Sequence, residues 1–347
     1  MAADDDTSGF PLRGVDDWQR RRPVISLPLS VIYKFFDDQG VYLAVIITYY
    51  AFLSIVPLLL LATSILGFLL FDDPTLRARV INSAVVHFPV VGDQLGRPGG
   101  LRGSVKAVVF GGAFALYGAM GLGTAVQNAL HTAWAIPRNS RPDPIRLRLH
   151  SLGLLATGGL SFVLLLAVST AAQVAGSQYA WLGGATSYVV HSVTFVVMTA
   201  VLALLLREGG GRRQSFRATL PGAIFISVGW LVVQLVSTTL VRHGLQQASS
   251  MNQTFGLILG LLAVAYLLAL ILVLGIEINV VRHHRLWPRA LLTPFTDAVD
   301  LTDGDKRAYT SYARSQRHKG FEAIAVRFRP RGRRSPSDPD APDGPPS

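Results

Sequence analysis

Glu277 is the residue of this chain whose type and position could do chemistry. It lies in the segment GIEIN, close to the end of a long apolar stretch. A carboxylate at the centre of a membrane span costs about 2.5–3.5 kcal/mol on insertion scales, so it usually faces protein or water. Two interpretations are open. Glu277 is an anion that reaches the headgroup region or pairs with Arg282, or it is a buried partner for a group on another helix.

Depth arithmetic favours a particular neighbour for Glu277. Asn128 lies as far along its predicted span as Glu277 does along its own, and both spans run inward, so the two residues should lie at one level. An interhelical hydrogen bond between such groups stabilises a bundle by about 0.6–1.7 kcal/mol, and it becomes functional only if the groups also line a cavity. The candidate polar cluster, or substrate-binding site, comprises Gln127, Asn128, Glu277, Asn279, Ser54 and Tyr49.

Prolines and glycines indicate where the helices bend or approach closely. Pro57 lies deep in the first span, where a proline removes a backbone hydrogen bond, so we predict a kink there. Pro221 and Gly222 stand near the start of the fifth span, and we interpret Pro221 as the start of that helix rather than an interior kink. Gly118 and Gly121 in the second span favour close packing over a flexible gate.

The sequence offers no catalytic motif. None of the eight histidines stands in a metal-ligand spacing, cysteine is absent, and there is no GxSxG elbow or phosphate-binding loop. Glu277 is the one acidic residue inside the predicted spans, so a carboxylate pair for acid–base chemistry is missing as well. We therefore predict that the protein is not an enzyme and carries no cofactor and no metal.

Composition places these residues in a membrane protein. The chain of 347 residues is 50% hydrophobic and only 15% charged, against about 25% charged in soluble domains. A helix needs about 20 apolar residues to cross a bilayer. Ser151–Leu206 is long enough for two crossings with a turn near Gly183 and Gly184. We expect an all-α polytopic protein with six transmembrane helices, at about 43–70, 107–135, 152–175, 187–206, 218–240 and 256–280.

The arginines set the expected orientation. The loops 138–150 and 207–217 are rich in arginine, whereas the turns at 176–186 and 242–254 are nearly bare, so the positive-inside rule puts both termini in the cytoplasm. Segment 72–106 is then external, despite its arginines, and should hold a short amphipathic helix. The net charge of +11 follows this topology and does not indicate nucleic acid. Candidate headgroup contacts are Arg138, Arg213 and Arg217.

Three parts follow from this pattern. Residues 1–40 form a cytoplasmic N-terminal segment, in which Leu27–Phe36 is amphipathic and lies in the inner interface. Residues 41–285 form the six-helix domain, including the external segment 72–106. Residues 286–347 form a basic, largely disordered cytoplasmic tail, in which Asp303–Arg329 could form a basic surface helix.

Four segments carry a resemblance to a known family. AVIITYYAFLSIVPLLLLATSILGF (44–68) resembles the first span of the YihY/BrkB family of bacterial inner-membrane proteins. Similar matches are GLGTAVQNALHTAWAIPR (121–138), LPGAIFISVGWLVVQLV (220–236) and FGLILGLLAVAYLLALILVLGIEIN (255–279). The resemblance covers about 20–285 in the family's order and spacing. One departure is Ala265-Tyr266, where family members often have a tryptophan.

The resemblance implies six helices with both ends cytoplasmic, in the bacterial inner membrane. Some members were once labelled tRNA-processing ribonucleases, and others are linked to serum resistance and envelope lipid export. Our leading hypothesis is a transporter or flippase-like protein for a lipid or other amphiphile. The alternative is a non-transporting scaffold for envelope-assembly proteins, and a ribonuclease ranks third. Expected partners are membrane lipids and either a second copy or envelope proteins, but no nucleic acid.

Overall fold

The computed structural model describes residues 12–69, 105–178, 185–209, 214–244, 250–295 and 299–328. The chain divides into two compact units. One unit comprises Met1–Ser30, Pro137–Asn139 and Leu286–Ser347, and the other comprises Val31–Ile136 and Ser140–Arg285. The regular elements in the described ranges are α-helices and one short 3₁₀ helix, as the sequence predicts, and no strand occurs in these ranges.

Long helices build the larger unit, here called the bundle. They correspond one to one to the six predicted spans and differ from them by several residues at some ends. Their bounds are α3 Gly40–Leu69, α6 Val105–Ala133, α7 Pro144–Gln178, α8 Ala185–Gly209, α9 Phe216–Gly244 and α10 Ser250–His284.

Within the described residues, three helical stretches are long and apolar enough to cross a membrane. They are Ser192–Gly209, Phe216–Val236 and Ile258–His284, and Gly40–Ser54 is a shorter apolar helix. The chain is therefore an all-α protein with membrane-capable helices. Six crossings and two cytoplasmic termini stay predictions.

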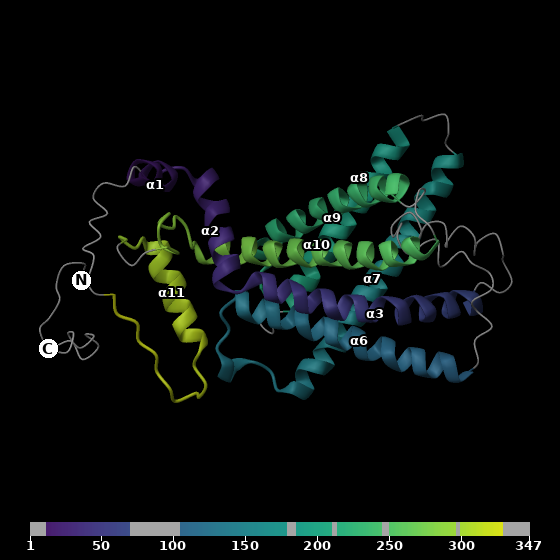
Figure 1. Ribbon diagram of the computed structural model, residues 1–347, viewed down its shortest axis with the longest axis horizontal. Coiled ribbons are helices and arrows are strands. Elements are labelled where there is room, and N and C mark those ends of the chain that lie inside the picture. Colours follow the sequence, from purple (N-terminus) through teal and green to yellow (C-terminus); the bar gives the residue numbers. More distant parts are fainter. Residues whose placement is uncertain are drawn as a thin grey trace, which may run out of the picture. The chain divides into compact units, whose positions relative to one another are not determined.

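The bundle helices pack in chain order. Each of the six contacts the next one along the chain, and α10 closes the arrangement by packing against α3. Figure 1 shows α3, α6 and α10 lying side by side. This arrangement places the end of α10 beside the start of α3, where the acidic residue of GIEIN lies.

Glycines allow close contacts between neighbouring helices. A Cβ atom on Gly118 would lie 3.0 Å from the Ser54 Cα, and one on Gly222 would lie 2.0 Å from the carbonyl oxygen of Gly275. A Cβ on Gly121 would meet the Tyr50 ring at 2.1 Å. These contacts fit the predicted close packing at Gly118 and Gly121, because a larger residue would require the neighbouring Tyr50 ring or Ser54 to shift.

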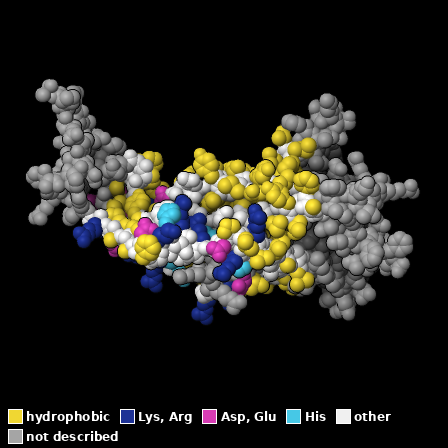
Figure 2. Space-filling model, turned by 90° about the horizontal axis from the view of Figure 1, so that it is seen from below, with side chains coloured by type: hydrophobic (Ala, Val, Ile, Leu, Met, Phe, Trp, Pro, Cys, Tyr) yellow, Lys and Arg dark blue, Asp and Glu magenta, His cyan; other side chains and the backbone are white. Residues whose placement is uncertain are grey.

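Large apolar side chains also point outward from the bundle. Figure 2 shows hydrophobic side chains forming a broad surface over its described part. Because such a surface is unfavourable in water, it fits contact with lipid chains. Among the exposed residues are Val45, Ile46, Leu160, Val196, Val232 and Leu235.

Two expectations about prolines have different outcomes. α9 begins at Phe216, so Pro221 lies inside the helix and does not start it. The interpretation of Pro221 as a helix start is wrong, because five residues before it are already helical. A proline at that position lacks the N–H of one backbone hydrogen bond. α3 continues through Pro57, but the side chain at this position lies outside the described residues, so the kink stays a prediction.

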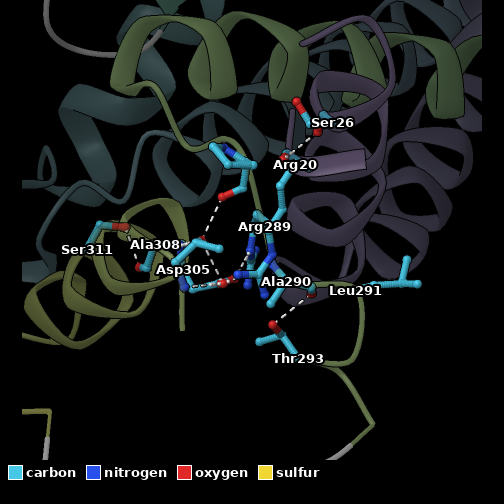
Figure 3. Close-up of polar contacts among 12 residues, drawn as sticks. Arg20, Ser26, Arg289, Ala290, Leu291, Thr293, Asp305, Ala308 and Ser311 are labelled. Carbon is cyan, nitrogen blue, oxygen red and sulfur yellow. Dashed lines mark hydrogen bonds and ion pairs between the residues drawn. The ribbon is translucent and has the colours of Figure 1, made fainter. Parts of the chain in front are cut away.

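The N-terminal and C-terminal segments meet in the smaller unit. It contains α1 Leu12–Arg20, the 3₁₀ turn Arg138–Ser140 and α11 Asp303–Ser315. Arg289 Nε donates to Asp305 Oδ1 at 2.7 Å, and both side chains are buried. In Figure 3 these two side chains point toward each other.

Asp305 also shapes the start of α11. Its backbone N–H donates to the Thr302 hydroxyl, while its carboxylate accepts the Thr302 backbone N–H, which is a capping box. It further accepts the Ala290 N–H at 3.0 Å. One carboxylate therefore fixes both a helix start and the chain that follows α10.

The structure corrects two expectations for the C-terminal part. The predicted helix Asp303–Arg329 is real only from Asp303 to Ser315, because residues 316–328 contain no helix. The expectation of a largely disordered tail does not hold for 286–295 and 299–328, since α11 and the buried Arg289–Asp305 pair organise this region. Residues from 329 onward, and the external segment up to 104, lie outside the described residues.

α2 is the helix Pro23–Asp37, and it contains the predicted amphipathic segment Leu27–Phe36. Val31 and Phe35 on it are buried, whereas Ile32 and Phe36 are exposed. The predicted helix is confirmed, and its place in the inner interface stays a prediction.

Replacing Gly222 by alanine tests the close contact of α9 with α10. We expect a loss of about 1–3 kcal/mol in the free energy of unfolding, because the new methyl group would overlap the Gly275 carbonyl. Thermal unfolding of the purified protein measures it. The control is Gly256→Ala on α10, which meets nothing within 4 Å. Equal melting temperatures for both variants would contradict the prediction.

Replacing Asp305 by alanine tests the smaller unit. The change leaves Arg289 buried without its carboxylate and removes the capping box, so we expect α11 to lose about 3–5 kcal/mol of local stability. Hydrogen exchange of the α11 amides is the measurement. Asp303→Ala removes the same charge from an exposed position in the same turn and should change exchange little. Similar exchange in both variants would show that the buried pair is dispensable.

Candidate functional site: a buried charge cluster

Lys34 is buried although lysine side chains normally extend to water. It lies in the last turn of α2, and its side chain is 1% exposed. A cation in that position is favoured by the negative end of the helix dipole. The Lys34 carbonyl accepts the backbone N–H of Asp38 at 2.9 Å, which carries the chain into the turn before α3. Local structure therefore sets Lys34 and Asp38 side by side.

The turn after α2 brings the acidic partner into place. Gln39 adopts a positive φ of 56°, and α3 begins at Gly40. A Cβ on Gly40 would overlap the Phe35 ring at 2.3 Å, so glycine there lets the turn pass close to that ring. The Lys34 ammonium donates a hydrogen bond to Asp38 Oδ2 in a buried position. The turn is thus built around an internal ion pair.

Glu277 adds a second carboxylate from α10. Its side chain is fully buried, and Glu277 Oε2 lies 3.5 Å from the Lys34 ammonium nitrogen. Ile276, Val280 and Val281 around it are buried as well. We call Lys34, Asp38 and Glu277 the charge cluster. It joins α2, the turn before α3 and the end of α10.

Electrostatics differ among the cluster's members. Burial by itself would lower the Lys34 pKa. The carboxylates of Glu277 and Asp38 raise it by more than burial lowers it, so the pKa lies above the ordinary 10.5. Burial raises the pKa of Asp38 above its ordinary 3.8, although Lys34 opposes the rise. Lys34 therefore stays charged at neutral pH, and Asp38 takes up a proton more readily than an exposed aspartate.

These pKa directions give two pH effects on folding that act in the same direction. The raised Lys34 pKa gives stability that is fully present below 10.5 and is lost as pH rises through the higher pKa of the folded protein. The raised Asp38 pKa means that the folded protein binds this proton more tightly, so stability increases as pH falls through that pKa toward 3.8. Both effects therefore make the cluster more stable as pH falls.

The open question about Glu277 is resolved in favour of burial. Its partner is Lys34, and Arg282 is exposed, so the interfacial interpretation is wrong. Glu277 can be buried because the Lys34 ammonium of α2 lies beside it and offsets its charge. The predicted partner on the second span does not join it, since Asn128 is exposed.

The other predicted polar residues are placed separately. The Asn279 Oδ1 accepts the Gly222 N–H at 2.7 Å and so ties α10 to α9. The Gln127 amide donates to the Ser151 hydroxyl at 2.7 Å and ties α6 to α7. Both side chains are buried. They act as interhelical hydrogen bonds rather than as parts of the charge cluster.

The remaining candidates lie elsewhere. Ser54 is buried and donates to the Ala51 carbonyl within α3, whereas Tyr49 is 59% exposed. Arg138 and Arg217 are exposed, as headgroup contacts must be, and Arg213 lies outside the described residues. No group of three or more His, Cys, Asp and Glu side chains gathers within the described ranges.

Lys34 and Asp38 are the site residues that sequence reasoning missed. Lys34 lies before the first span, as Arg20, Arg21 and Arg22 do, and the positive-inside rule accounts for such residues without a buried site. One signal was present: Lys34 and Asp38 stand four residues apart at the end of an amphipathic helix, a spacing that brings side chains together.

Comparison with known proteins places the chain in context. The model of a family described as Virulence factor BrkB matches residues 31–295, a range that includes the whole charge cluster. The chain is also similar to the Putative ribonuclease-like protein YfkH of Bacillus subtilis (strain 168), with 29% identity over 96 residues, 27% of this chain and 34% of that protein. The match thus spans about a third of that relative's length. No solved structure matches the chain.

Replacing Lys34 by methionine tests the charge cluster. We expect the free energy of unfolding to fall by about 3–5 kcal/mol, because two buried carboxyl groups lose their cation. Thermal unfolding measures it, with Arg21→Met as the control that removes an exposed positive charge. The double variant Lys34→Met/Glu277→Gln should recover part of the loss. A double variant that is no more stable than additivity allows would show that Lys34 and Glu277 do not interact.

Proposed function

The chain belongs to the BrkB virulence factor family, and from this premise we propose that it transports a lipid or another amphiphile across the bacterial inner membrane during envelope biogenesis. Membrane-capable helices and membership of this family make it a membrane protein. The transport step, the substrate class and the inner membrane are the proposed part.

The observation that carries the proposal is the buried charge cluster. Burying an ion pair costs several kcal/mol per ion in desolvation, and apolar side chains of similar size would often stabilise a protein equally well. Ionisable groups inside a membrane bundle are therefore expensive, and they commonly mark a substrate or ion pathway. Lys34, Asp38 and Glu277 are buried in the bundle among apolar neighbours such as Ile276, Val280 and Val281.

The surroundings of the cluster suit an amphiphile. A lipid presents a polar headgroup and apolar chains at once. The cluster supplies charges, while α2 exposes Ile32 and Phe36 on the side opposite the buried Lys34. Exposed apolar side chains also continue along α3, at Val45 and Ile46. A headgroup that reached the cluster could therefore keep its chains against an apolar surface.

The non-transporting scaffold is the second candidate. The smaller unit favours it, because Phe295 and Phe321 are 80% and 91% exposed there and could bind a partner protein. The ribonuclease hypothesis ranks below both. Its support is the name of one relative, which matches over about a third of its length.

A reconstitution experiment tests the transport proposal. Purified protein is placed in vesicles of phosphatidylethanolamine and phosphatidylglycerol that carry fluorescently labelled phosphatidylglycerol, and movement of the label between leaflets is followed. We expect wild-type protein to accelerate movement over empty vesicles. Glu277→Gln should slow it roughly tenfold or more, equivalent to about 1.4 kcal/mol in the barrier.

The matched control is Asp143→Asn, which removes an exposed carboxylate that pairs with exposed Arg146. It should keep the wild-type rate. Folded wild-type protein that moves no more label than empty vesicles would contradict transport of this lipid. Retained partner binding on pull-down, lost when residues 286–347 are deleted, would then support the scaffold.

A further inference from the structure

We propose that Asp38 and Glu277 together form a proton-binding site, in which one proton is held between the two carboxyl groups and its release is coupled to the transport step. This inference deepens the proposed function and rests on it for the coupling. Binding of the proton itself rests on the geometry of the charge cluster alone.

The first step is a count of charge. The cluster contains one ammonium and two carboxyl groups, and all three side chains are at most 3% exposed. With every group ionised it would carry one uncompensated negative charge. A carboxylate without a partner is far more costly to bury than a carboxylic acid, so two carboxyl groups that share one site hold a proton between them.

The second step is how the single Lys34 charge is shared between the two carboxyl groups. Lys34 Nζ donates a hydrogen bond to Asp38, whereas Glu277 lies farther from it at 3.5 Å. Both Glu277 oxygens are buried and neither makes a hydrogen bond of ordinary geometry, although the carboxyl group lies close enough to Asp38 and Lys34 to interact with both. The positive charge is thus used mainly by Asp38. Glu277 is the carboxyl group that gains most from a proton.

The third step concerns the groups around the pair. Asp37 acts on Asp38 and adds negative charge to this end of the bundle. His284 at the end of α10 interacts with Lys34. The last turn of α10 also carries Arg282 and His283, which are both exposed.

The helices packed against α10 add no further cation to the pair. α3 carries no Asp, Glu, Lys, Arg or His. His131 near the end of α6 interacts with Arg141 and His150, and Arg217 at the start of α9 is exposed. Lys34 is therefore the cation that balances the pair in the described part of the bundle.

The proton balance of the proposed step is simple. A proton from water binds a carboxylate oxygen and gives a carboxylic acid, which leaves Lys34 and the other carboxylate as a neutral pair. When the cluster becomes exposed or a substrate headgroup approaches, the acid returns its proton to water. Lys34 then bridges two carboxylates, and the net negative charge favours a change of conformation or of bound cationic group.

Infrared spectroscopy of the purified protein tests the proton. At neutral pH we expect the C=O stretching band of a buried carboxylic acid. Glu277→Gln and Asp38→Asn should each abolish this band, because either change leaves Lys34 with a single carboxylate and makes the cluster neutral without a proton. Asp143→Asn, at an exposed position, should leave the band intact. A band that is absent from wild type, or that persists in both variants, overturns the proton site.

A pH gradient across the same vesicles tests the coupling. The wild-type rate should change with the gradient by up to about tenfold per pH unit, the limit for one coupled proton. The Asp38→Asn variant should move lipid at a rate that does not depend on the pH gradient. A wild-type rate that is indifferent to the gradient overturns the coupling even if the band is present. Absence of all lipid movement with the band intact contradicts the proposed function and leaves the proton site standing.

Discussion

One buried ammonium facing two carboxylates is the constraint on which this end of the bundle depends. Lys34 cannot reach water, so its charge must be balanced where it lies. The balance comes from the turn after α2 and from the last turns of α10. An amphipathic helix, the start of α3 and the end of α10 are thereby held together by charge rather than by apolar contact alone.

Other contacts in the bundle follow a different principle. Three interhelical hydrogen bonds join neutral groups: Gln127 with Ser151, Thr199 with Ser227, and Asn279 with the Gly222 backbone. Each satisfies a polar group that would otherwise be buried without a partner, and each joins two helices that are adjacent in the chain. Glycines at the same interfaces let the backbones approach. Because these hydrogen bonds involve neutral groups, they stabilise the bundle and need neither a ligand nor a proton to balance a charge.

In the smaller unit one carboxylate likewise satisfies several partners. Asp305 satisfies Arg289, caps α11 and accepts the Ala290 N–H. Asp16 of α1 accepts the Leu291 N–H, and the Gln19 side chain donates to the Arg289 carbonyl. Hydrogen bonds from Gln19, Arg20 and Leu291 outweigh burial and lower the Asp16 pKa. Segments from opposite ends of the chain therefore fold as one unit, which the division into an N-terminal segment and a tail did not foresee.

The sequence by itself determined the helices. Charge-free apolar stretches of sufficient length predict all six long helices of the bundle. The thickness of a bilayer and the rise per residue of a helix together fix how many residues a crossing needs. It also identified Glu277 as the costly residue and the glycines of the second span as packing positions. Family resemblance pointed to the same proteins that the comparison found.

Only the tertiary structure decided which side chains meet. Depth along a span gives the level of a residue but not the side of the helix on which it lies, and successive residues differ by about 100°. Gln127 therefore faces α7 whereas the adjacent Asn128 is exposed. Lys34 looks in sequence like any basic residue before a first span, because desolvation is a property of its surroundings. Its burial against Glu277, which is distant in the chain, depends on the packing of α10 against α3.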